Sequence, residues 1–193
     1  MAAADPIFAA LTAPGTPFEI GERGGMQQFV RAPADLNSLI ESARRHGAGT
    51  FIVEGDRRLS YDETFARRDA LAAMLTIAPG ERVAICMRNR AEWMIAFLAT
   101  IRDRGVAELV NSRRAPAELR AAVEECTPAL VLADSERAAL LVAAAYPGRV
   151  IDARDFPSEG RFDREIAPAA PDDPAAILFT SGTTGRVKGA VLS

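Results

Sequence analysis

The stretch RVAICMRNRAEWMIAFLATIRDRGVAELV, residues 82–110, decides the fold class. Apolar runs at 82–87 and 106–110 are typical of buried strands. Between them, apolar side chains recur at helical spacing, at Trp93, Met94, Phe97, Leu98 and Ile101. Asn89 and Glu92 are the expected caps of this helix. A strand, a helix and a second strand in this order predict a parallel sheet.

The same alternation continues to the end of the chain. We expect a helix from Pro116 to about Cys126 and another that Ser135 caps and that ends near Pro147. Further strands are expected at 129–133, 149–153 and 175–179, the last after a Pro/Ala linker at 167–174. The pattern predicts an α/β fold whose mostly parallel, flavodoxin-like (doubly wound) sheet has helices on both faces. Ligands of such sheets bind at the carboxyl ends of the strands.

The residues before this region predict two further segments. Residues 1–35 are rich in proline and glycine and are interpreted as an irregular N-terminal arm. Residues 36–78 predict a helix with Asp35 as its N-cap, a hairpin turning at Gly55-Asp56, and a helix opened by the Ser60/Glu63 capping box. They form part of a second subdomain, and the α/β subdomain occupies residues 79–193.

Composition excludes several classes of function. The 193 residues are 49% hydrophobic and 25% charged, which is typical of a globular protein. A net charge of -3 argues against a nucleic-acid partner. No apolar run approaches the roughly 18 residues of a transmembrane segment, no signal peptide is visible, and two cysteines fit a cytoplasmic protein. One histidine, His46, in a loop-like run, is too few for a His/Cys zinc site.

Other reactive side chains favour structural interpretations. Cys86 and Cys126 are expected to be core or near-core thiols, and Trp93 to pack on a helix face. Arg113 and Arg114 are expected in a solvated loop, with contact to phosphate or coenzyme A as the less favoured alternative.

The residues that carry chemistry follow the strand at 175–179. There the chain reads Phe179-Thr180-Ser181-Gly182-Thr183-Thr184-Gly185-Arg186-Val187-Lys188-Gly189. Glycines let the backbone present N–H groups to an anion, hydroxyls add donors, and lysine adds a mobile charge. Lys188 is the only lysine of the chain. The segment predicts a polyphosphate-binding loop, although Gly189 after Lys188 departs from a Walker A motif. A surface hairpin turn is the alternative.

At residues 179–193 the sequence resembles the phosphate-binding signature of the adenylate-forming ANL superfamily, which includes acyl-CoA synthetases. Residues 59–61, 87–93, 111–119 and 130–134 resemble other segments of that family, so the resemblance covers most of the chain from about residue 36. Val187 stands where the family usually has proline, and Glu108 where its strand is usually more apolar. Family members are more than twice as long as this chain, so the resemblance is to part of the family's N-terminal domain.

The resemblance implies an ATP-dependent carboxylic acid–CoA ligase that forms acyl-AMP and then acyl-CoA. A fatty or aromatic acid, ATP, Mg²⁺ and coenzyme A would be its substrates and cofactors. It implies nucleotide contacts by Thr180, Ser181, Gly182, Thr183, Thr184 and Gly185, with Lys188 also as the catalytic cation. We expect the isolated chain to be inactive, to need no cofactor and to self-associate as a dimer. The alternative is a non-catalytic phosphate-binding, nucleotide-binding or protein-interaction α/β module.

Overall fold

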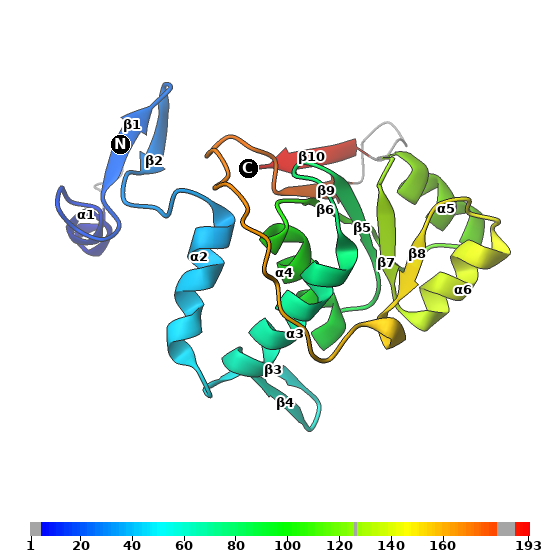
Figure 1. Cartoon of the computed structure of the whole chain (residues 1–193). Coiled ribbons are helices and arrows are strands. Elements are labelled where there is room, and N and C mark those ends of the chain that lie inside the picture. The colour runs from blue at the N-terminus through cyan, green and yellow to red at the C-terminus, as the bar shows by residue number, and fades with distance from the viewer. Residues whose placement is uncertain (1–4, 126, 181–187) are drawn as a thin grey trace. The chain divides into compact units, whose positions relative to one another are not determined.

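Six strands form the central sheet of residues 35–193, in the order β10-β9-β6-β5-β7-β8 (Figure 1). The computed structural model of the protein describes residues 5–125, 127–180 and 188–193. The strands are β5 (Arg82–Cys86), β6 (Val106–Leu109), β7 (Leu130–Ala133), β8 (Val150–Asp152), β9 (Ala176–Thr180) and β10 (Lys188–Leu192). Strands β5 to β9 pair in parallel, whereas β10 runs antiparallel to β9. The predicted mostly parallel sheet is confirmed, with one antiparallel strand at its edge.

Helices cover both faces of this sheet. Alternate side chains of β5 enter two separate cores: Val83 and Ile85 face one, and Ala84 and Cys86 face the other. The first core contains α3 (Tyr61–Leu75) and α4 (Ala91–Arg102), and the second contains α5 (Pro116–Glu125) and α6 (Ser135–Ala143). Burial on both faces explains why these strands are mostly apolar rather than alternating, with Glu108 of β6 as an exception.

The segment before the sheet contains the predicted helix, hairpin and helix. Helix α2 (Leu36–Ser42) continues as a 3-10 turn η1 (Ala43–His46), and Asp35 caps it by accepting a hydrogen bond from the Ser38 N–H at 2.7 Å. Strands β3 (Thr50–Glu54) and β4 (Arg57–Ser60) enclose the predicted two-residue turn, where Gly55 has φ +57°. At the start of α3, both hydrogen bonds of the Ser60/Glu63 capping box are present.

Two of the predicted caps are wrong. The N-cap position of α4 is Arg90 rather than Asn89, and the Ala91 N–H donates instead to Glu54 of β3 at 3.3 Å. The N-cap of α6 is Asp134, one residue before the predicted Ser135, whose hydroxyl donates to Asp152. Both residues of the Asp-Ser pair are good caps. Asp134 takes this position because its carboxylate also accepts a hydrogen bond from the N–H of Arg88, which follows β5.

Helix α6 is shorter than predicted. It ends at Ala143, whereas the sequence predicted an end near Pro147. The chain leaves the helix through Ala145, whose φ of +53° lies in the left-handed region. No glycine stands there to mark this stop in the sequence, so proline and glycine further along suggested a later one.

A long connection, which we call the strap (residues 153–175), carries the chain from β8 at one edge of the sheet to β9. It begins with the short η2 (Ala153–Asp155) and passes over the face that bears α3 and α4 (Figure 1). The guanidinium groups of Arg102 and Arg164 lie over the ring of Phe162, 4.6 and 5.1 Å from its centroid. Arg164 forms an ion pair with the fully buried Asp103 at 2.6 Å. These contacts hold the strap against the helices.

Residues 1–34 form a compact unit separate from 35–193. This segment is not irregular throughout, as the sequence suggested, because it contains α1 (Pro6–Leu11), β1 (Ile20–Arg23) and β2 (Met26–Phe29). Asp5 caps α1 by accepting from the Ile7 N–H at 2.8 Å, and Gly24 and Gly25 supply the positive φ angles of the hairpin turn. The division of the chain into an arm, a second subdomain and an α/β subdomain stays a prediction.

The corrected cap of α6 leads to a stability prediction. Asp134→Ala should lower the free energy of unfolding by about 3 kcal/mol, since it removes a cap and leaves the buried Arg137 without one of its carboxylates. The matched control Ser135→Ala loses one half-buried hydrogen bond and should cost about 1 kcal/mol or less. Urea unfolding of both variants measures the difference. Equal losses would contradict the assignment of the cap to Asp134.

Candidate functional site

The structure fixes the two ends of the predicted phosphate-binding loop. Thr180 is the last residue of β9 and Lys188 the first of β10, and the two are Cα partners in the antiparallel register. The predicted residues Ser181, Gly182, Thr183, Thr184 and Gly185 lie outside the described residues. A strand, β10, follows the loop where a Walker A motif would have a helix.

The loop starts at the carboxyl edge of the sheet, by which we mean the carboxyl ends of β5, β6, β7 and β9. Strand β9 pairs in parallel with β6, with Leu178 opposite Leu109. The chain that leaves β6 therefore starts beside the chain that leaves β9. Strand β6 lies on one side of β5, and β7 and β8 lie on the other, so the order of the strands reverses next to β5. Ligands of doubly wound sheets bind at this edge, near such a reversal.

Asp134 joins three elements at this edge. One carboxylate oxygen accepts the N–H of Arg88, after β5, at 3.0 Å, and the other accepts the N–H of Arg137 in α6 at 3.0 Å. The guanidinium of Arg137 lies 3.4 Å from both oxygens. Burial opposes ionisation of Asp134, but these N–H donors and the Arg137 charge hold its pKa below the ordinary value. The carboxylate is thus a fixed negative charge between β5 and β7.

Arg137 also connects Asp134 to the loop after β6. Its Nε donates to the carbonyl of Ser112 at 2.9 Å, and only 4% of Arg137 is exposed. Within the loop, the Asn111 side chain accepts the N–H of Arg113 at 3.0 Å, as in an Asx turn. The sequence did not indicate this role for Arg137. An aspartate directly after a strand, with an arginine three residues later, is the signal that could have suggested it.

Two residues with reactive side chains, Cys86 and Glu108, are fully buried in the sheet. Burial, with the nearby charges of Asp134 and Glu108 adding to it, raises the pKa of the Cys86 thiol to about 12. Cys86 is fully buried and, as expected, is a core thiol. Glu108, which departs from the family pattern, is also fully buried within β6. The thiol is therefore protonated and unsuited to act as a nucleophile at neutral pH.

Two other side chains considered in the sequence, Trp93 and His46, contact aromatic rings. Trp93 stacks on Phe97 with ring centroids 5.8 Å apart, and the pair packs against the core of α3 and α4. His46 is exposed in η1 rather than in an open loop, and its ring lies 4.9 Å from that of Tyr61. Cys126 lies outside the described residues.

No group of His, Cys, Asp and Glu among the described residues could hold a metal ion. In that same part of the chain, no helix is long and apolar enough to cross a membrane.

A cavity of about 320 Å³ lies away from the carboxyl edge. Gly80, Gly105 and Ala175, which precede β5, β6 and β9, line it together with residues of the strap. It is thus at the amino ends of the parallel strands, the end opposite the predicted loop. Its position gives no support to a nucleotide site there.

These observations define an α/β protein in which a segment rich in hydroxyl residues and glycine follows β9 at the carboxyl edge of the sheet. A family model described as AMP-binding enzyme matches residues 39–193. The chain therefore belongs to the family of AMP-binding enzymes, in agreement with the resemblance to the ANL superfamily.

Individual relatives are similar over most of this chain. The medium/long-chain-fatty-acid–CoA ligase FadD6 of Mycobacterium tuberculosis is 27% identical over 188 residues, which cover 89% of this chain and 32% of FadD6. A polyketide synthase-nonribosomal peptide synthetase of Aspergillus clavatus is 29% identical over 166 residues, covering 83% of this chain and 4% of that protein. The structure of O-succinylbenzoate coenzyme A synthetase (MenE) from Bacillus subtilis in complex with AMP has a TM-score of 0.66 at 26% identity, covering 78% and 40%. The chain thus spans well under half of each of these relatives.

Proposed function

We propose that this chain is the N-terminal part of an ATP-dependent carboxylic acid–CoA ligase that acts in the cytoplasm. The observation that carries the proposal is the position of the predicted loop, whose ends, Thr180 and Lys188, pair at the carboxyl edge of the sheet in an AMP-binding family member. FadD6 and MenE, both named as forming CoA products, support a CoA ligase. The similarity to a nonribosomal peptide synthetase favours a second candidate, an adenylation domain with another thiol acceptor.

The proposed chemistry has two steps. A carboxylate oxygen of a fatty or aromatic acid attacks the α-phosphorus of ATP, and the bond from that phosphorus to the bridging oxygen breaks. Pyrophosphate leaves with the electron pair, and acyl-AMP remains. In the second step the thiolate of coenzyme A attacks the acyl carbon and AMP leaves. Positioning and electrostatic stabilisation are most of what a protein contributes to such phosphoryl chemistry.

We assign the loop residues to the leaving pyrophosphate. The hydroxyls of Thr180, Ser181, Thr183 and Thr184 would donate to phosphate oxygens, as would the backbone N–H groups of Gly182 and Gly185. Lys188 would neutralise the charge that develops on the β- and γ-phosphates. Since the described residues contain no acidic cluster for a metal, we assign none of them to Mg²⁺. The metal would enter bound to ATP.

The first prediction concerns the isolated chain. The 193 residues by themselves should not form acyl-AMP, because they span only 40% of the MenE chain. Exchange of labelled pyrophosphate into ATP, with a panel of fatty and aromatic acids, should stay at the level of a control without protein. Exchange clearly above that level would contradict the proposal that the chain is a part.

The second prediction concerns Lys188 in the full-length ligase. A charge-assisted hydrogen bond is typically worth about 1.5–3 kcal/mol, so Lys188→Ala should slow acyl-AMP formation about 10- to 150-fold. The loss should appear in kcat more than in the KM for ATP, because the charge on pyrophosphate grows in the transition state. Lys188→Arg should restore part of the rate, since a rigid fork replaces a mobile point charge.

Transfer to the thiol from preformed acyl-AMP is the internal control. It should be nearly unchanged in Lys188→Ala, because pyrophosphate has already left. Assays of both half-reactions on the same preparations separate the two steps. Equal slowing of both, or an unchanged adenylation rate, would rule out Lys188 as the proposed phosphate cation.

We also propose that the chain self-associates through β10. This edge strand has an unpaired side, and Leu178, Val191 and Leu192 of the β9–β10 pair are 39%, 58% and 47% exposed. Exposed apolar edge strands tend to pair with a second copy. Sedimentation at tens of micromolar should show a dimer, and Val191→Lys should shift it to the monomer. A wild-type chain that is entirely monomeric would refute the proposal.

A further inference from the structure

The first turn of α6 contacts the chain where it leaves two other strands of the sheet. The helix follows β7 directly, so its cap, Asp134, lies at the carboxyl edge. Asp134 accepts the N–H of Arg88, after β5, at 3.0 Å. One turn into the helix, the Nε of Arg137 donates to the carbonyl of Ser112, after β6, at 2.9 Å. The pair of Asp134 and Arg137 therefore joins the chain at the ends of β5, β6 and β7.

The hydrogen bonds of the sheet itself end before these contacts. Strand β5 pairs with β7 up to Cys86 and with β6 up to Ile85. The contacts of Asp134 and Arg137 lie beyond these positions, on the connections that follow the strands. Since β6 lies on one side of β5 and β7 on the other, the pair spans the point where the strand order reverses. Ligands of doubly wound sheets bind near such a point.

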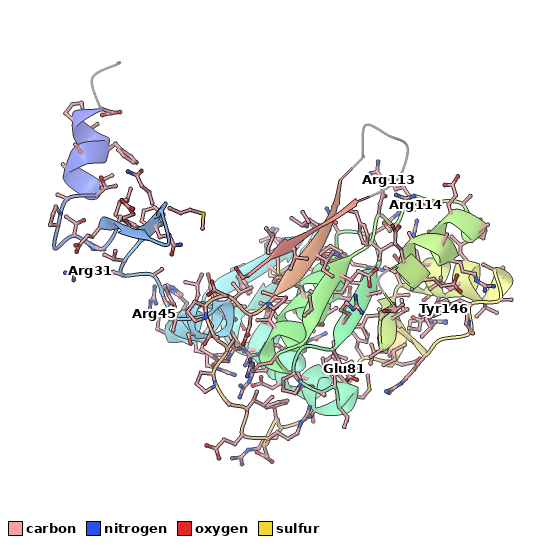
Figure 2. The ribbon with its side chains drawn as sticks, turned by 90° about the horizontal axis from the view of Figure 1, so that it is seen from above. Arg31, Arg45, Glu81, Arg113, Arg114 and Tyr146 are labelled. Carbon is pink, nitrogen blue, oxygen red and sulfur yellow. The ribbon has the colours of Figure 1, made fainter. Side chains whose placement is uncertain are left out.

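The contacts of this turn are all at one end of the sheet. Figure 2 shows Arg113, the residue after Ser112, at the end opposite Glu81, which precedes β5. At the same carboxyl end, the Ser135 hydroxyl donates to Asp152, the last residue of β8, at 3.0 Å. The start of α6 thus contacts the ends of strands on both sides of β5.

Asp134 and Arg137 are each only 4% exposed. Removing two charges from water costs several kcal/mol for each ion, so a buried pair of this kind adds little net stability. Its hydrogen bonds are directional, however. The Nε of Arg137 is used on the Ser112 carbonyl, while Nη1 lies 3.4 Å from both oxygens of Asp134 and 2.7 Å from Glu136. This division of the planar fork fixes the position of the connection after β6 relative to α6.

We propose that Asp134 and Arg137 are positioning residues for acyl-AMP formation, because they fix the connections after β5, β6 and β7 relative to one another at the carboxyl edge. The inference rests on the proposed function, which places the reaction at that edge. Neither side chain is assigned a contact with substrate. A displacement of about 1 Å at a reacting centre can cost about 100-fold in rate, so even small movements of these connections should slow the reaction.

Hydrogen exchange of the 193-residue chain tests the geometry. Arg137→Lys keeps the charge beside Asp134 but replaces the fork by a single nitrogen, so the amides of residues 111–114 should exchange at least about tenfold faster. Asp134→Asn keeps a good cap but has one carbonyl oxygen where two oxygens accepted, so it should act in the same direction. The urea midpoint of each variant shows that it is folded under the conditions of the measurement.

The matched control is Arg120→Lys. Arg120 also joins a helix to distant backbone, because its guanidinium donates to the carbonyls of Ala144 and Ala145 at 2.9 and 3.0 Å and to Glu124 at 2.8 Å. These contacts lie beyond the other end of α6, away from the carboxyl edge. The control should leave exchange at residues 111–114 unchanged.

Kinetics of the full-length ligase test the consequence. Arg137→Lys and Asp134→Asn should slow acyl-AMP formation about 10- to 100-fold, and Arg120→Lys should change it less than about twofold. The loss should persist as the assay temperature is lowered, since it belongs to folded enzyme and not to an unfolded fraction. Transfer to the thiol from preformed acyl-AMP should slow as well, because both steps use this edge. Lys188→Ala, in contrast, should slow adenylation alone.

The outcomes separate the inference from the proposed function. Unchanged exchange at residues 111–114 in Arg137→Lys overturns the inference. Faster exchange with unchanged rates, or an equal loss of rate in Arg120→Lys, also overturns it, because the pair would then be structural only. If Lys188→Ala slows adenylation and the α6 variants do not, the inference fails and the proposed function stands. A wild-type full-length protein that forms no acyl-AMP contradicts the proposed function and the inference together.

Discussion

The ion pair between Asp103 and Arg164 anchors the strap that leads the chain to β9. Strand β9 follows β8 in the chain but belongs on the other side of the sheet, beside β6, so the strap must cross the helices between them. Asp103 at the end of α4 is fully buried, and it accepts from Arg164 and from the Ile77 N–H. Burial raises the pKa of Asp103 in spite of these partners, so its ionised form costs free energy that a satisfied hydrogen-bond network must offset. This anchor lies on the strap that leads to β9 and the predicted phosphate-binding loop.

Much of the fold could be predicted because local patterns and packing agree. Apolar strands alternating with helical spacing indicated the parallel sheet, and the capping box at Ser60 marked the start of α3 correctly. The two errors in the helix caps arose where a distant residue decides a local feature. Asp134 displaces Ser135 as the cap of α6 because it also accepts the N–H of Arg88, after β5. At the start of α4, Glu54 of the hairpin accepts the N–H of Ala91. The partners in these hydrogen bonds are far apart in the sequence, so a short stretch of sequence cannot contain both of them.

In the candidate site, too, the sequence could not show which distant segments lie side by side. Residue types alone indicated the loop ending at Lys188, and the structure adds that its ends are partners in the β9–β10 register. The sequence could not show that the loop after β6 leaves the sheet beside β9, since this follows from strand order. The sequence predicted that Arg113 and Arg114 lie in a solvated loop, and in the structure Arg113 is exposed and Arg114 half-buried. Arg137, which the sequence did not single out, orients the loop through the Ser112 carbonyl.

The path of the strap also makes the predicted phosphate-binding loop separable from β5 to β8. Residues 158–161 are all exposed, and the anchors Phe162 and Arg164 lie after them. A cut there leaves β5 to β8 on one piece, whereas β9, the loop and β10 stay with their own anchors on the other. The second piece could thus be added in trans, as in fragment complementation. Versions of the predicted phosphate-binding loop with different residues could then be exchanged on one unchanged scaffold.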